Sequence, residues 1–263
     1  MRTCWTLFTV FGIPVRAHLS VGLLALYLLF MMLPNLGVGL FLAAALLVSI
    51  VLHELAHSVV AMAFGGQVRD ITLQLLGGCA AITRMPPKPI HECLMAAAGP
   101  ACSLLLAALC WGLSRTFPAI YQDYDIYGRL VTVAAPNLWL SVAAALNLGL
   151  ACFNLVPAFP MDGGRILRAG IQCLGKSKLA ATEIAVEVGR AFAILWAALC
   201  VLSFVDIRFH APADWPQAIA YLWEIVFGGG GILLLCVAYM IWVSGKRELE
   251  YVRYEETYYG GWR

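Results

Sequence analysis

The sequence predicts an all-α polytopic membrane protein with about six transmembrane helices. Of its 263 residues, 62% are hydrophobic and only 12% are charged, whereas a soluble domain is nearer half apolar and a quarter charged. The apolar runs extend over almost the whole chain, and the mean hydropathy is +0.84. A soluble domain with a single anchor is therefore excluded. We expect one membrane-embedded domain over residues 1–263, with residues 245–263 forming a short cytoplasmic tail.

Each expected span holds roughly the 20 apolar residues that a membrane helix needs. The candidate spans are residues 18–34, 38–64, 92–113, 130–156, 183–205 and 218–244.

Two irregular connections interrupt the apolar runs. Residues 65–91 contain two β-prone pieces separated by Gly77 and Gly78, which predicts a short hairpin or re-entrant segment after the second span. Residues 157–182 begin with prolines and glycines, and proline cannot continue an α-helix. We therefore expect extended backbone at the end of the fourth span.

The basic residues predict the orientation of the chain. With six spans, thirteen of the 17 lysines and arginines lie on the side of the two termini and three on the other side. Because cytoplasmic loops carry the excess of basic residues, both termini are predicted to be cytoplasmic, in a cell (inner) membrane. The hairpin after the second span is then cytoplasmic too. The net charge of +2 gives no reason to expect a nucleic-acid partner.

The second span contains the stretch "HELAH", which places His53, Glu54 and His57 among apolar residues. Histidines four residues apart lie on one face of a helix and can bind the same zinc ion. Glu54 can then take a proton from water beside the metal. Ionisable groups inside a span cost about 2.5–3.5 kcal/mol each, so three of them together predict a metal site.

A catalytic zinc needs a third protein ligand and an open fourth position. Asp162 is the best-placed acid, because it lies in "FNLVPAFPMDGGR" at the predicted cytoplasmic end of the fourth span. The second and fourth spans run in the same direction, so this end is expected near the histidines. A helix cap for the segment that follows remains the alternative for Asp162.

These two motifs together resemble the site-2 protease family of intramembrane zinc metalloproteases. Its proline-and-aspartate motif is similar to "NLVPAFPMDGG", residues 154–164, and its glycine-rich hairpin to "LQLLGGCAAI", residues 73–82. The resemblance implies one Zn²⁺ per chain, with Asp162 as the third ligand. It also implies that Asn154 contacts substrate or steadies the oxyanion, a structural role being the alternative.

Within that family the chain looks most like the compact sporulation-type branch without a PDZ or CBS domain. The family's "A-G-P" element is similar to "AAGP", residues 97–100, but Ser103 stands where an asparagine is often found. We expect that departure to affect packing only.

The resulting functional hypothesis is a zinc metalloendopeptidase that cuts transmembrane segments of other proteins, as in regulated intramembrane proteolysis. The expected partners are the lipid bilayer and a substrate such as a membrane-tethered transcription factor, an anti-sigma factor or a signal-peptide remnant. Residues 70–82 would offer a free strand edge to an unwound substrate, or act as a plug. A catalytically silent membrane chaperone and a metal transporter are the alternatives, and Glu54 with the motif at 154–163 argues against both.

Overall fold

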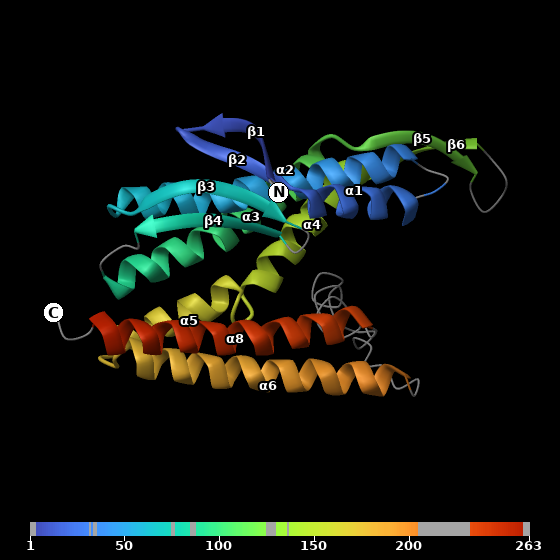
Figure 1. The fold of residues 1–263 in the computed structure, drawn as a ribbon. Helices are drawn as coiled ribbons and strands as arrows, with labels where there is room; N and C mark the ends of the chain where they lie inside the picture. Colours follow the sequence, from blue (N-terminus) through green and yellow to red (C-terminus); the bar gives the residue numbers. More distant parts are fainter. Residues whose placement is uncertain are drawn as a thin grey trace. The chain divides into compact units, whose positions relative to one another are not determined.

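The fold is known from a computed structural model that describes residues 4–31, 33, 36–74, 77–84, 88–124, 130–135, 137–204 and 232–259. The chain divides into two compact units, which are considered one at a time (Figure 1). Unit 1 contains residues 1–84 and 101–151, and unit 2 contains residues 85–100 and 152–263.

Helices make up most of the described chain. They are α1 (Leu19–Met31), α2 (Leu36–Ala63), α3 (Pro89–Thr116), α4 (Leu138–Asn154), α5 (Asp162–Cys173), α6 (Lys178–Phe204) and α8 (Ile232–Tyr259). Among the described residues, three helical stretches are long and apolar enough to cross a membrane, namely α2, α3 and Lys178–Leu202 of α6. The chain is thus an integral membrane protein of mostly helical fold, and its full number of spans stays a prediction.

One of the expected spans differs from the structure. The fourth, at 130–156, begins as a strand: β6 (Leu130–Ala135) pairs with β5 (Ala119–Tyr124), and α4 starts only at Leu138. A continuous apolar run does not distinguish a strand from a buried helix, and the β-branched residues of "LVTVAA" favour the strand. Of the sixth, at 218–244, residues 232–244 are described, and they are helical as expected; this helix, α8, continues through the expected tail to Tyr259.

A four-stranded sheet lies in unit 1, in the order β1 (Cys4–Val10), β2 (Ile13–His18), β3 (Gln67–Gln74) and β4 (Gly77–Arg84). β2 and β3 are parallel, and the outer pairs are antiparallel. Strands β1 and β2 were not predicted from the sequence. Gly77 and Gly78 were expected between the two β-prone pieces, but both glycines lie within β4.

The order of the strands leaves β3 in the interior and β4 at an edge of the sheet. Helix α2 packs on this sheet, because Ile50 shares a buried apolar cluster with Ile71 and Leu73 of β3. The hydrophobic effect therefore brings the hairpin of β3 and β4 alongside the helix that carries the "HELAH" stretch.

In unit 2, helices α6 and α8 lie side by side (Figure 1). Trp196 of α6 and Ile241 of α8 belong to one buried cluster, and that cluster includes Val156, Ala158 and Met161. The last three residues come from the loop at 155–161, which leads from α4 into α5. Packing against two long helices thus anchors this loop.

Candidate metal centre

The two histidines of α2 form the first part of the site. Both are buried, and their ring centroids lie 4.8 Å apart. Nδ1 of His53 lies 2.9 Å from Oγ of Ser103, which is fully buried on α3. When Nδ1 donates its proton to that hydroxyl, Nε2 is left as the nitrogen that can bind a metal. Ser103 therefore orients a candidate ligand, whereas from the sequence this residue was expected to affect packing only.

Glu54 is half-buried and lies against strand β4. A Cβ at Gly78 would be 2.3 Å from Cγ of Glu54 and 3.0 Å from its Oε1. Carbon atoms in ordinary contact are about 3.5–4.0 Å apart. The glycine is thus required for the strand and this carboxylate side chain to lie so close.

Asp162 is buried and is the first residue of α5. The N-cap of that helix is Met161, so the alternative of Asp162 as the cap is wrong. Residues 155–160 before it fold in short turns and are not extended as expected, whereas Met161 itself has an extended backbone. The amide of Ala158 donates to the carbonyl of Val156 at 2.7 Å, and the amide of Met161 donates to that of Ala158 at 2.9 Å.

Two glycines after Asp162 let the first turn of α5 pack directly on this loop. A Cβ at Gly163 would lie 2.3 Å from the carbonyl oxygen of Val156, and one at Gly164 would lie 2.7 Å from the carbonyl carbon of Ala158. Both distances are shorter than any real contact of a Cβ atom. The "DGG" sequence is thus a packing requirement that fixes where α5, and with it Asp162, begins.

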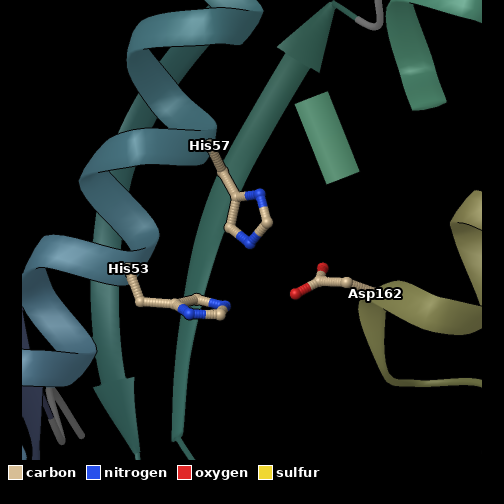
Figure 2. Close-up of side chains that lie close together, drawn as sticks. All are labelled: His53, His57 and Asp162. Carbon is tan, nitrogen blue, oxygen red and sulfur yellow. The ribbon is translucent and has the colours of Figure 1, made fainter. Parts of the chain in front are cut away.

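His53, His57 and Asp162 together could hold a metal ion. One ligand atom from each lies within 4.8 Å of the others, and Figure 2 shows the two rings and the carboxylate pointing toward one another. In the part of the chain that the structure describes, this is the one such group of three. Two imidazole nitrogens and a carboxylate oxygen are a donor set that suits catalytic zinc, so these residues fit the expected ion. Asn154, the last residue of α4, is half-buried.

Comparison with known proteins decides the family. Residues 41–196, more than half of the chain, match Peptidase family M50. The chain belongs to this family. Its fold is similar to a site-2 protease from Methanocaldococcus jannaschii, with a TM-score of 0.61 and 29% identity over 94% of this chain and 95% of that one.

Relatives in sequence agree with this membership. A zinc metalloprotease of Methanocaldococcus jannaschii, MJ0392, is 33% identical over 198 residues, which are 75% of this chain and 54% of the relative. Stage IV sporulation protein FB of Bacillus subtilis is 24% identical over 123 residues, 46% of this chain and 37% of that protein. The chain spans about half the length of two zinc metalloproteases that it matches. The resemblance to the site-2 proteases is therefore confirmed, and these names support a zinc-dependent peptidase.

Proposed function

We propose that this M50 chain is an intramembrane zinc metalloendopeptidase that hydrolyses peptide bonds in or near transmembrane segments of other membrane proteins. The observation that carries the proposal is the buried group of His53, His57 and Asp162, with Glu54 directly after the first histidine. These three residues hold one Zn²⁺ per chain. A transporter also places such groups in its spans, but it does not need a glutamate at that position.

Bound zinc supplies Lewis acidity, which acidifies water and polarises a peptide carbonyl. The chain's own residues do the rest. Glu54 takes one proton from the water whose oxygen adds to the carbonyl carbon, and it gives that proton to the amine nitrogen as the C–N bond breaks. Ser103 holds the ring of His53, and Gly78 leaves the space that the Glu54 side chain occupies.

Strand β4 is the proposed docking edge for the substrate. A transmembrane helix has its carbonyls hydrogen-bonded, so it must unwind before hydrolysis, and an unwound segment can add to a sheet as a strand. Within residues 70–82, β3 is paired on both sides and only β4 lies at an edge. Gly78 places this strand beside Glu54, which supports docking rather than a plug. Asn154 is proposed to contact the substrate backbone or steady the oxyanion.

The substrates proposed are membrane-tethered transcription factors, anti-sigma factors or signal-peptide remnants. The enzyme lies in the cell inner membrane with both termini and the hairpin of β3 and β4 on the cytoplasmic side. Reporter insertions test this orientation: one near Lys176 should read cytoplasmic and one near Asp123 should read external. The reverse pattern would reject the orientation and leave the chemistry untouched.

Two variants test the chemistry. Glu54→Gln keeps the ligands but removes the base, so the purified protein should retain about one zinc per chain while cleavage of a reporter span falls about 10²–10⁴-fold. Asp162→Ala should lose zinc. The measurements are elemental analysis and cleavage in detergent. Unchanged cleavage by Glu54→Gln would show that Glu54 is not the base of the proposed hydrolysis. A wild-type protein that binds zinc but cleaves no transmembrane span would favour the silent-chaperone alternative.

A further inference from the structure

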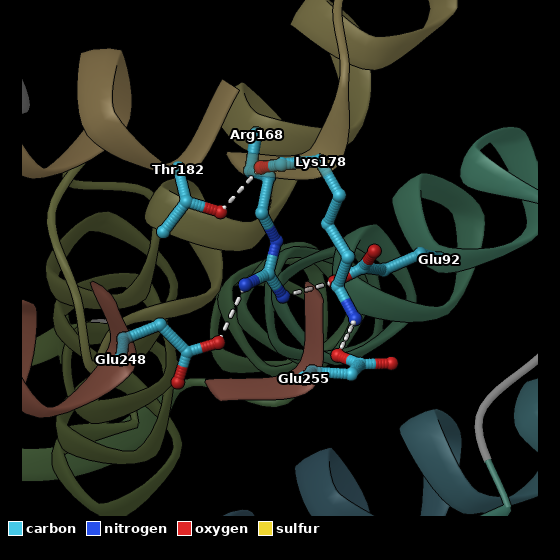
Figure 3. Close-up of polar contacts among 6 residues, drawn as sticks. All are labelled: Glu92, Arg168, Lys178, Thr182, Glu248 and Glu255. Carbon is cyan, nitrogen blue, oxygen red and sulfur yellow. Dashed lines mark hydrogen bonds and ion pairs between the residues drawn. The ribbon is translucent and has the colours of Figure 1, made fainter. Parts of the chain in front are cut away.

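Arg168 is a buried arginine on α5, six residues after Asp162. Its guanidinium binds two acids from two other helices, Glu92 in the first turn of α3 and Glu248 in α8 (Figure 3). Burial alone would lower the pKa of Arg168. The two carboxylates raise it by more, so the net shift of the pKa is upward and the side chain stays charged.

A third contact links Arg168 to the loop that presents Asp162. The Cζ atom of Arg168 lies 5.2 Å from the ring centroid of Phe159. Phe159 is buried and packs with Ala185 and Val186 of α6. One side chain of α5 therefore contacts α3, α8 and the loop at 155–161, three residues before the aspartate.

We propose that Arg168 is a positioning residue, and that with Glu92 and Glu248 it forms a clamp that fixes the carboxylate of Asp162 for metal binding. This inference rests on the proposed role of Asp162 as a ligand. A short aspartate side chain can reach a metal only from a backbone held in the right place. The guanidinium is a rigid planar fork, so its two hydrogen bonds and the stacked ring fix α5 in several directions at once.

A role in positioning α5 explains the ion-pair cluster of Arg168, Glu92 and Glu248 better than a contribution to the free energy of unfolding does. Buried ion pairs contribute little net stability, because the cost of removing charges from water offsets their attraction. Here one cation faces two carboxylates, and the side chain of Arg168 is only 3% exposed. The second half of α8 was expected from the sequence to be only a tail. Under this proposal it contributes to metal binding through Glu248.

The chain offers a closely matched control. Glu255 also lies on α8 and accepts a hydrogen bond from Lys178 of α6 at 2.7 Å (Figure 3). The side chains of Glu248 and Glu255 are 33% and 32% exposed. The two acids share a helix, a residue type and an exposure, and they differ in that only the Arg168 pair includes α5.

The test compares Glu248→Gln with Glu255→Gln in the full chain in detergent. Glutamine keeps an acceptor oxygen but removes the charge. We expect Glu248→Gln to raise the Kd for zinc, measured by competition with a chelating dye, about tenfold, at the low end of effects seen for groups that orient metal ligands. The visible spectrum of the Co²⁺-substituted protein should change with it, because that spectrum reports ligand geometry. Glu255→Gln should leave both readouts at wild-type values.

A second variant covers the case in which Glu248→Gln misfolds. Arg168→Lys keeps the charge but not the fork, and it should shift the same two readouts in the same direction. Equal Kd values and equal Co²⁺ spectra for the Glu248 and Glu255 variants would overturn the clamp. The variant Asp162→Ala separates the two proposals. If Asp162→Ala binds zinc normally, Asp162 is not a ligand, and both the ligand assignment and the clamp proposal are wrong. If Asp162→Ala loses zinc while Glu248→Gln keeps wild-type zinc affinity, only the clamp proposal is wrong.

Discussion

The substitution Gly78→Ala tests whether Glu54 is positioned by strand β4. Gly78 does not have the positive φ that would itself forbid a side chain, so the strand backbone accepts alanine. The three atoms nearest to the added methyl group would all belong to the side chain of Glu54: Cγ at 2.3 Å, Cδ at 2.9 Å and Oε1 at 3.0 Å. The perturbation therefore falls on the proposed base and not on the proposed ligands.

The size of the effect follows from these distances. A contact of 2.3 Å must lengthen to at least about 3.5 Å, so the Glu54 side chain moves by about 1 Å or takes another rotamer. A misplacement of about 1 Å at a reacting group costs about 10²-fold in rate. The strain itself is small, about 0.5–1.5 kcal/mol for a displaced side chain. We expect kcat to fall about a hundredfold, with zinc affinity and folding nearly unchanged.

The assay measures kcat on a reporter span, the zinc Kd and the melting temperature of the same preparation. Gly112→Ala is the matched control, since nothing lies within 4 Å of a Cβ at that glycine. A wild-type kcat in Gly78→Ala would refute the reasoning about Glu54. A loss of kcat accompanied by an equal loss of zinc would do the same, because the ligands should not respond.

Two further predictions concern the neighbours of the site. Ser103→Ala removes the partner of His53 Nδ1 and should raise the zinc Kd about 10–100-fold, as measured by chelator competition; an unchanged Kd would show that the hydroxyl does not orient the ring. Proline at Ala80 or at Ala81 removes one backbone donor each, and successive donors of a strand point to opposite sides. The proline that removes the donor at the free edge of β4 should cripple cleavage of a helical span but spare a flexible peptide and the zinc content. Intact cleavage of the span in both variants would exclude docking on β4.

The two histidines of the candidate site could be predicted because their relation is local. His53 and His57 are one helical turn apart, and the spacing alone puts them on one face. Asp162 is more than a hundred residues away, and only its motif singled it out. The residues proposed to orient these ligands had no comparable signal in the sequence. Ser103 is 50 residues from His53, and Arg168 is 80 residues from Glu248.

The fold could be predicted from the sequence where a long apolar run forms a helix, and it could not be predicted where short segments form strands. The long apolar runs correctly indicated α2, α3 and α6. The same criterion failed at residues 130–135, where an apolar run forms strand β6. Strands β1 and β2 were missed although they form a local hairpin around Phe11 and Gly12, and the pairing of β2 with β3 more than fifty residues later has no signal in local spacing.

Glycines determine the local geometry on both sides of the chemistry, and they do so in two different ways. A Cβ at Gly78 would meet a side chain, which can rotate away, whereas a Cβ at Gly163 would meet the backbone carbonyl oxygens of Leu155 and Val156 at 2.4 and 2.3 Å. The backbone there cannot yield without moving the start of α5, and Asp162 moves with it. Alanine at Gly163 should therefore act on metal binding, and alanine at Gly78 on proton transfer. Glycine permits a close approach at both positions. Substituting the two glycines one at a time therefore tests metal binding by Asp162 separately from proton transfer by Glu54.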